Sequence, residues 1–333
     1  MKVRTIKKKT VVYFVIFILI VVLLAVGIVF LSRWSSQRNA VDVESITEDA
    51  NETFVINGKT YVKKGNLDSI LLIGIDQFDE NEVVLNNRNN RLNDFNMLVV
   101  IDNDAKNYAA VQVNRDTMAY VHALDENGED FGTEYEQIAF AHSFGSGGKD
   151  SCINTVNTVS DYLYGADINH YASFTMDAVP ILNDLVGGVT VTCISDFSNQ
   201  YPEMTEGATV TLKGEQALTY IRARKSMADP TNIARMERQR QYLDAFREQL
   251  KQDVDVNQDF ISKAFKLLND EVVTDCTVNQ LDRLYDKAKD YEFLGILTPD
   301  GESVKGEEYM EFTANEDDLR QIIVDIYYSP VDE

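Results

Sequence analysis

The residues best suited to chemistry gather in one basic segment of an acidic chain. Residues 215–240 hold six basic and three acidic side chains, a sum of +3, whereas the formal net charge of the whole chain is −23. A basic island in an acidic protein is typical of an anion-binding site. The alternative interpretation is a set of surface salt bridges to the many acidic side chains.

The spacing inside this segment predicts two elements that face one ligand. Alternating polar and apolar residues over 220–224 predict a strand that carries two arginines on one face. Further along, arginines and a glutamine spaced three or four apart predict one side of a helix. Because the planar fork of arginine pairs with phosphate oxygens, this set suits a pyrophosphate. The predicted ligands are Arg222, Arg224, Arg235, Arg238 and Gln239.

Three strands are predicted at the start of the main domain, over Ser69–Asp76, Asn96–Asp102 and Tyr108–Asn114. The last two form a hairpin around a turn at residues 103–106. A symmetric hairpin that pairs Ile101 with Tyr108 has a register sum of 209, and 94 plus 115 gives the same sum. We therefore expect Asp94 and Arg115 to be cross-strand neighbours.

Asp76 and Asp94 are predicted to meet at one end of these strands. Two nearby carboxylates repel unless a cation lies between them or one takes a proton. Mg²⁺, or Mn²⁺ in its place, prefers oxygen ligands and completes its shell with water and substrate phosphate. The pair is therefore either a divalent metal site or a set of strand-end caps and arginine partners.

The N-terminal part of the chain predicts a membrane anchor. Val11–Leu31 is an unbroken run of 21 apolar or small residues, preceded by five basic residues and by no acid. The positive-inside rule puts the ten-residue N-terminus in the cytoplasm and everything after about Ser32 outside. A cleaved signal peptide is the alternative, but the run is longer than the usual apolar region and no A-x-A site follows it. Residues 32–66 are predicted to form a stalk with a small hairpin across Asn57-Gly58.

Composition argues against a nucleic-acid-binding protein and against a disulfide-rich scaffold. Without the five basic residues before the anchor, 26 basic residues face 54 acidic ones, a balance of −28. Such a surface repels nucleic acid. The three cysteines, Cys152, Cys193 and Cys276, are too few for a disulfide scaffold and are predicted to be small buried residues.

The middle of the chain indicates an α/β domain. Helices are predicted over Lys149–Tyr164 and Met176–Val186, and a strand over Val189–Cys193. The apolar face of the second helix is either core or the lining of a lipid groove. The glycines of residues 145–148 lack the spacing of a phosphate loop. His142 is either a base or, as we expect, a hydrogen-bonded core residue.

These motifs, taken in order, resemble one family. Besides the anchor they are ILLIGID at 70–76, the aspartate at 94, NRDT at 114–117, DLVGGVTV at 184–191, LKGEQALTYIRAR at 212–224 and ARMERQRQ at 234–241. The chain resembles the LytR-CpsA-Psr family of bacterial cell-envelope proteins over roughly residues 67–250.

The resemblance implies a three-layer α-β-α sandwich with a central mixed sheet, preceded by one transmembrane helix. It implies a catalytic domain over 67–252. The motifs do not cover residues 253–333, where the sequence itself predicts a helical region packed on the domain, with helices near 257–269, 278–290 and 316–328. It also implies an extracytoplasmic, membrane-bound enzyme. That enzyme transfers a glycopolymer, of the teichoic acid or capsular polysaccharide type, from a polyprenyl pyrophosphate to peptidoglycan with the help of Mg²⁺.

By position, Asp76 and Asp94 match the metal-side acids of the family, and Arg115 matches the arginine of its RDT motif. The strand and helix ligands named above match its paired arginines and its helical arginine and glutamine. The chain departs from the family at Leu92, where an arginine is usual, so Arg91 is the substitute ligand. Phe95 and Asn114 also replace the usual threonine and proline.

The expected reaction is phosphoryl transfer, in which Asp94 takes the proton of the attacking sugar hydroxyl and Arg115 helps to neutralise the phosphate. Two alternatives remain. Water could replace the sugar, which makes a polyprenyl-pyrophosphate phosphatase, or the protein could be a non-catalytic envelope sensor or transcription attenuator. The ten residues before the anchor offer no room for a cytoplasmic output module, which favours the enzyme.

Overall fold

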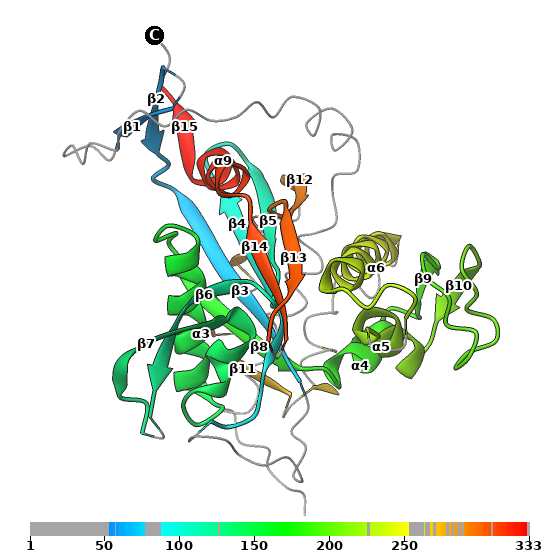
Figure 1. Ribbon diagram of the computed structural model, residues 1–333. Coiled ribbons are helices and arrows are strands. Elements are labelled where there is room, and N and C mark those ends of the chain that lie inside the picture. Colours follow the sequence, from blue (N-terminus) through cyan, green and yellow to red (C-terminus); the bar gives the residue numbers. More distant parts are fainter. Residues whose placement is uncertain are drawn as a thin grey trace, which may run out of the picture.

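Figure 1 shows the computed structural model of the chain. It describes residues 53–56, 58–76, 88–125, 127–224, 227–252, 271–277, 290–307 and 309–331, and separate positions between 263 and 287. The predicted cytoplasmic tail, anchor and first part of the stalk lie outside these residues. No helix among the residues described is long and apolar enough to cross a membrane.

A six-stranded mixed sheet forms the centre, in the order β11-β8-β3-β4-β5-β12. Its strands are β3 (Leu67–Ile75), β4 (Asn93–Asp102), β5 (Asn107–Val113), β8 (His170–Thr175), β11 (Val272–Thr274) and β12 (Glu292–Leu297). Strand β4 runs antiparallel to its neighbours β3 and β5, while β8 is parallel to β3 and β12 is parallel to β5. This confirms an α/β fold with a central mixed sheet.

The predicted hairpin register is confirmed. Ile101 pairs with Tyr108, and Asn96 pairs with Val113 at the other end of the ladder. Asp94 and Arg115 lie just beyond that end, so the two side chains can reach each other across the strands.

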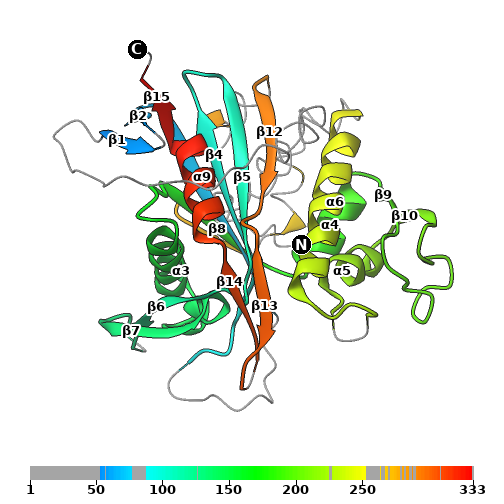
Figure 2. The same cartoon turned by 45° about the horizontal axis from the view of Figure 1, so that its top comes forward.

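Helices cover both faces of the sheet (Figures 1 and 2). On one face lie α3 (Lys149–Tyr162) and α9 (Glu316–Tyr327), and on the other lie α4 (Ala178–Leu185), α5 (Glu215–Arg222) and α6 (Asn232–Gln252). Strand β4 contributes side chains to both hydrophobic cores because successive side chains point to opposite faces of the sheet. Met97 and Val99 belong to the core under α4, whereas Leu98 and Val100 belong to the core under α3 and α9.

Smaller elements surround this frame. The predicted hairpin across Asn57-Gly58 is confirmed as β1 (Thr53–Ile56) and β2 (Lys59–Lys63), and β15 (Tyr328–Pro330) adds a third strand to it. The other two-stranded sheets are β6–β7 (Met118–Leu124, Asp130–Gln137), β9–β10 (Val189–Thr192, Thr209–Leu212) and β13–β14 (Gly301–Lys305, Met310–Ala314). A 3₁₀ helix, η2 (Ile138–Ser143), follows β7. All three cysteines are buried and free, as predicted.

The strand predicted over residues 220–224 is wrong, because the chain there completes helix α5 and then continues as extended backbone at Ala223. Ala217, Leu218 and Tyr220 are buried, a helical spacing that outweighs the local alternation. Of the three helices predicted near the C-terminus, the one near 316–328 is confirmed as α9, and the other two lie largely outside the described residues. The strands β11 to β14 of this region were not predicted.

His142 is a fully buried residue of η2. Its Nδ1 lies 3.2 Å from the carbonyl oxygen of Arg91, and its Nε2 lies 3.8 Å from Sγ of Cys152. Its backbone N–H donates to Oδ1 of Asn93 at 3.1 Å. Burial lowers the pKa of His142 from 6.5 to about 4. The ring is therefore neutral at neutral pH, as expected of a core residue that donates Nδ1–H to a carbonyl group.

This shift predicts a pH-dependent stability. In the unfolded chain the histidine takes up a proton below pH 6.5, whereas in the folded protein it does so near pH 4. Stability is therefore lost as the pH falls from 6.5 to 4, by about 3 kcal/mol in all. Urea unfolding of the wild type should show this loss, and His142→Gln, which keeps a donor for the carbonyl group, should show a smaller one. Parallel curves for the two proteins would contradict the assignment.

Candidate functional site

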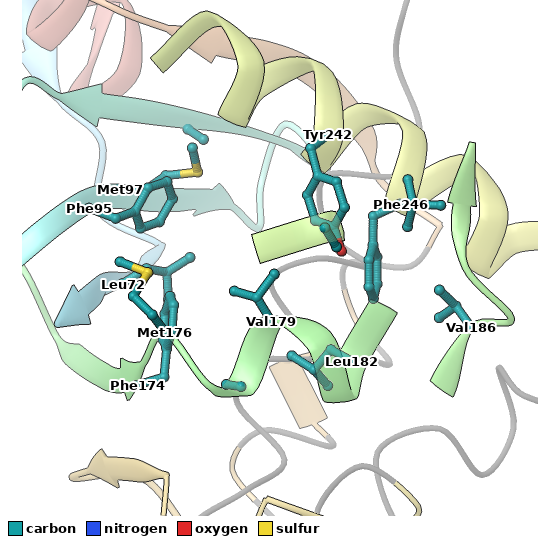
Figure 3. Packing of buried hydrophobic residues seen from close by; sticks show 14 of the residues in the cluster. Leu72, Phe95, Met97, Phe174, Met176, Val179, Leu182, Val186, Tyr242 and Phe246 are labelled. Atoms are coloured by element: carbon teal, nitrogen blue, oxygen red, sulfur yellow. The ribbon is translucent and has the colours of Figure 1, made fainter. Parts of the chain in front are cut away.

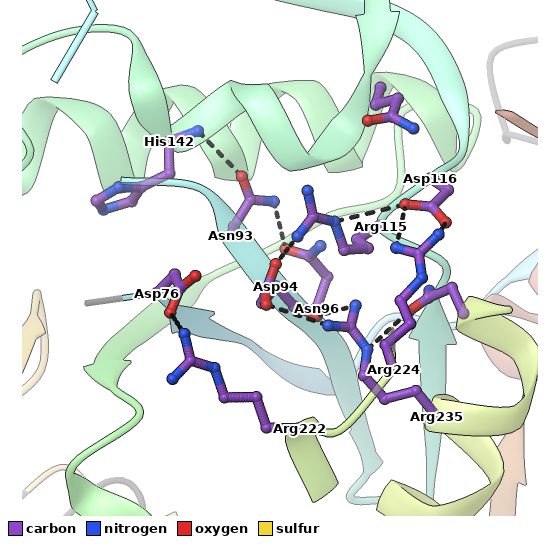
Figure 4. Close-up of polar contacts among 12 residues, drawn as sticks. Asp76, Asn93, Asp94, Asn96, Arg115, Asp116, His142, Arg222, Arg224 and Arg235 are labelled. Carbon is purple, nitrogen blue, oxygen red and sulfur yellow. Dashed lines mark hydrogen bonds and ion pairs between the residues drawn. The ribbon is translucent and has the colours of Figure 1, made fainter. Parts of the chain in front are cut away.

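The candidate site lies at one end of the central strands, where β3 ends, β4 begins and β5 ends (Figure 4). Asp76 follows β3, and its backbone N–H donates to the carbonyl oxygen of Leu92 at 3.0 Å. Asp94 is the second residue of β4 and is 7% exposed. Arg115 lies two residues after β5. The antiparallel order of three neighbouring strands thus brings these side chains to one edge.

Asp94 pairs with two arginines from distant parts of the chain. Its carboxylate forms an ion pair with the guanidinium group of Arg115, which confirms the predicted cross-strand contact. Its Oδ2 also accepts a hydrogen bond from Nη1 of Arg235 on α6 at 3.1 Å. Both guanidinium groups are deeply buried, at 13% and 4% side-chain exposure. A buried acid with two guanidinium partners fixes both arginines in place.

Asp116 was not assigned a role from the sequence, although it directly follows Arg115. Its carboxylate accepts hydrogen bonds from both terminal nitrogens of Arg224, at 2.6 and 3.2 Å, in a bidentate pair. Asn114 holds the turn by accepting the backbone N–H of Asp116 at 2.9 Å. It also accepts the side chain of Asn232, whose own oxygen accepts Nε of Arg235 at 2.8 Å. The N-R-D-T turn therefore positions arginines from both later segments.

Arg222 and Asp76 form the outer pair of the site. Arg222 ends α5 and its guanidinium group bonds the Asp76 carboxylate. Their side chains are 40% and 33% exposed, so this pair lies at the rim while the Asp94 pairs lie inside. The two strand arginines predicted to share one face thus reach the same site from a helix end and from the loop after it.

The cluster holds more positive than negative charge. Four arginines and three aspartates give +4 − 3 = +1. Burial, followed by repulsion from Arg235, lowers the pKa of Arg115 to about 10, and burial followed by repulsion from Arg224 does the same for Arg235. Both remain protonated at neutral pH. The site therefore holds converging cations that an anionic ligand would stabilise.

The remaining predicted ligands lie around this cluster. The Gln239 amide nitrogen donates to the carbonyl oxygen of Ile221 at 3.2 Å, and its oxygen accepts from Gln112 at 2.9 Å. Arg238 is 1% exposed and donates to backbone carbonyl groups at the end of α5, Tyr220 among them, at 2.9 Å. These contacts hold the end of α5 in place. Arg91 lies with its side chain against Gly147, beside the loop before α3.

A narrow apolar cavity lies beside the cluster, between β3, β4 and β8 on one side and α4 and α6 on the other (Figure 3). Several residues that line the cavity are close in sequence to residues of the arginine cluster. Phe95 follows Asp94, Ile221 precedes Arg222, and Gln239 lies one helical turn after Arg235. The free volume is about 40 Å³. A long apolar group would therefore enter only if side chains of α4 and α6 move apart.

The chemistry of the donor set suits a hard divalent ion. Asp76 and Asp94 offer carboxylate oxygens at the same strand edge, and Asp76 is partly exposed. Both already pair with arginine, so an ion would share them with those groups or displace a guanidinium. Within the described part of the chain, the group of three potential metal ligands lies elsewhere, at His170, Asp275 and Cys276.

The sequence matches the LytR_cpsA_psr family over residues 29–323. Among curated proteins, it is 31% identical over 206 residues to "Polyisoprenyl-teichoic acid–peptidoglycan teichoic acid transferase TagU" of Enterococcus faecalis, which covers 61% of this chain and 61% of that protein. It is 30% identical over 190 residues to the corresponding transferase TagT of Bacillus subtilis, over 55% of this chain and 52% of that protein. These alignments span less than two thirds of either relative.

A solved structure described as "TagT bound to LI-WTA" has the same fold. It superposes with a TM-score of 0.59 at 20% identity, over 78% of this chain and 89% of that one. The fold, the order of the motifs and the match over most of the sequence agree. The chain belongs to the LytR-CpsA-Psr family.

Proposed function

We propose that this protein is a membrane-anchored phosphotransferase that moves an anionic glycopolymer from a polyprenyl-pyrophosphate carrier to peptidoglycan. The observation that carries the proposal is the convergence of four arginines on one strand edge, two of them buried with lowered pKa values. The names of the relatives supply the class of donor and acceptor.

The position of the apolar cavity supports a lipid-linked donor. A polyprenyl pyrophosphate has an apolar tail joined directly to a charged head. Asp94 and Phe95 are adjacent on β4, and the first belongs to the arginine cluster while the second lines the cavity. The same change from charged to apolar occurs between Arg222 and Ile221. An amphiphile could therefore place its head on the arginines and its tail between α4 and α6.

In the free protein, the arginines that would bind phosphate form ion pairs with three carboxylates. We infer that the phosphate oxygens of the donor replace the carboxylates of Asp94 and Asp116 on Arg115, Arg224 and Arg235. Asp94 is then released to accept a proton. A sugar hydroxyl attacks the phosphorus next to the polymer, its proton passes to Asp94, and the bond to polyprenyl phosphate breaks. The arginines stabilise the charge that develops on the leaving phosphate.

Asp76 and Asp94 would hold Mg²⁺ or Mn²⁺, which would supply further positive charge next to the pyrophosphate, and Asp94 would alternate between metal binding and proton acceptance. We also propose that residues 11–31 anchor the protein and that the domain lies outside the cell membrane. An anchor raises the effective concentration of the site near a lipid-embedded donor.

The arginine cluster predicts stabilisation by pyrophosphate. A ligand that binds the folded state alone stabilises it by about 2.7 kcal/mol at a hundred times its Kd. Inorganic pyrophosphate should raise the Tm of the wild type, and Arg235→Met should lose most of the rise, since each charged hydrogen bond contributes about 1.5–3 kcal/mol. Arg320→Met, at an exposed arginine of α9, is the matched control. Equal shifts in all three proteins would contradict the assigned site.

The apolar cavity predicts a separate response to a lipid tail. Val179→Trp on α4 should fill the cavity and weaken binding of geranylgeranyl diphosphate, while binding of inorganic pyrophosphate is retained. Ile153→Trp, at an exposed position of α3, is the control for a new surface tryptophan. Calorimetry with both ligands checks this. If Val179→Trp weakens both ligands equally or neither, the tail lies elsewhere.

The proposed role of Asp94 as proton acceptor predicts that replacing it abolishes transfer while the fold is retained. Asp94→Asn keeps the size of the side chain but removes the proton acceptor, and should lower the transfer rate by at least about a hundredfold. Mass analysis of products from a purified lipid-linked donor and peptidoglycan measures ligated polymer, with circular dichroism to check folding. An active Asp94→Asn protein would overturn the base assignment, and free polymer as the sole product of the wild type would indicate a phosphatase.

A further inference from the structure

A second, wider cleft opens beside the arginine cluster. Its volume is about 510 Å³, within the size range of clefts that hold small ligands. Residues on its walls come from the segment before β4, from β6, β7 and η2, and from the β13–β14 hairpin. They include Arg88, Leu92, Met118, Tyr135, Phe140 and Tyr309. None of these side chains is used in the mechanism above.

The cleft begins where the phosphate site ends. The carbonyl oxygen of Leu92, which lines it, accepts the backbone N–H of Asp76 at 3.0 Å. Ala139 in η2 donates its N–H to the carbonyl oxygen of Arg115 at 3.0 Å, and Phe312 in β14 donates to that of Asp116 at 2.8 Å. Both walls of the cleft are thus hydrogen-bonded to the turn that carries the proposed phosphate ligands.

Aromatic rings line this cleft and remain accessible. Tyr135 and Tyr309 are 60% and 56% exposed, values that are high for large rings. Phe140 packs edge-on against Tyr309, with ring centroids 5.8 Å apart. Ring faces of this kind carry partial negative charge and pack against the C–H faces of sugars.

The charge of the cleft is opposite to that of the phosphate site. Glu134, Glu136, Glu307 and Glu311 lie on or next to its walls. Arg88 is the basic side chain on its lining, and it pairs with the first two of these acids. Over the residues that line the cleft, Glu136, Glu307, Glu311 and Arg88 sum to −2. Such a surface repels a polyanion, whereas carboxylates accept hydrogen bonds from the hydroxyl and amide groups of an uncharged sugar chain.

We propose that this cleft binds the acceptor, an uncharged glycan strand of peptidoglycan, and aims one of its hydroxyl groups at the phosphate site. The inference rests on the proposed function for the direction of transfer. It adds that the two substrates are separated by charge, with the anionic donor on the arginines and the neutral glycan on the acidic, aromatic cleft.

Binding of chitotetraose to the full chain in detergent tests the proposal. This uncharged tetramer of N-acetylglucosamine has the backbone linkage of peptidoglycan. Tyr309→Ala and Tyr135→Ala should each weaken its binding by about fivefold to tenfold and leave the pyrophosphate-induced rise in Tm unchanged. Tyr164→Ala, at a 47% exposed tyrosine after α3, is the matched control and should bind like the wild type.

Two results would overturn the proposal. One is a wild type that responds to pyrophosphate but does not bind chitotetraose, or binds it equally well in all variants. The other is loss of binding to poly(glycerol phosphate) in the tyrosine variants, which would assign the cleft to the donor polymer. Failure of the proposed function is distinguishable, because it appears as a missing pyrophosphate response or missing transfer in a wild type that still binds chitotetraose.

Discussion

The pairing of Asp94 with Arg115 and Arg235 is the interaction on which the rest of the site depends. Removing three charged groups from water is costly unless each finds an oppositely charged or hydrogen-bonding partner. Here one carboxylate serves two guanidinium groups, and Asn232 holds the second of them. The pairing joins β4, the end of β5 and α6. It keeps positive charge at a defined place on the sheet edge.

In this arrangement the carboxylates that pair with the arginines can be exchanged for an anionic ligand. The carboxylates satisfy the arginines in the free protein, yet one positive charge is left over and the arginines repel one another. A diphosphate can replace the carboxylates without leaving a buried guanidinium group unpaired. The apolar cavity and the acidic cleft lie on different sides of the same cluster, so the tail, phosphates and acceptor of the proposed reaction would each meet a surface of matching character.

Part of this site could be predicted from the sequence. The register sum placed Asp94 opposite Arg115 because a short, regular turn fixes the pairing of a hairpin. Convergence of Arg222, Arg224 and Arg235 followed from charge and chemistry, although the strand assigned to residues 220–224 was wrong. That segment is short, and its alternation is compatible with a helix that ends at Arg222. Local pattern alone therefore identified the arginines that converge but not the backbone that carries them.

Other features depend on contacts that local patterns do not reveal. Asp116 acts through a bidentate pair with Arg224, 108 residues away, and Arg238 is taken up by backbone carbonyl groups at the end of α5. Strands β11 and β12 are short and complete the two edges of the sheet only through long-range pairing. The acidic cleft likewise needs a hairpin from the C-terminal part of the chain to meet η2, and no spacing within either segment indicates that contact.

Mass spectrometry of the lipids that co-purify with the detergent-solubilised full chain tests the central claim most directly. We expect the wild type to retain a polyprenyl phosphate or pyrophosphate, and a variant that lacks both Arg224 and Arg235 to lose it. If the wild type carries ordinary phospholipids alone, or if the variant retains as much phosphorylated isoprenoid as the wild type, the arginine cluster is not the diphosphate site.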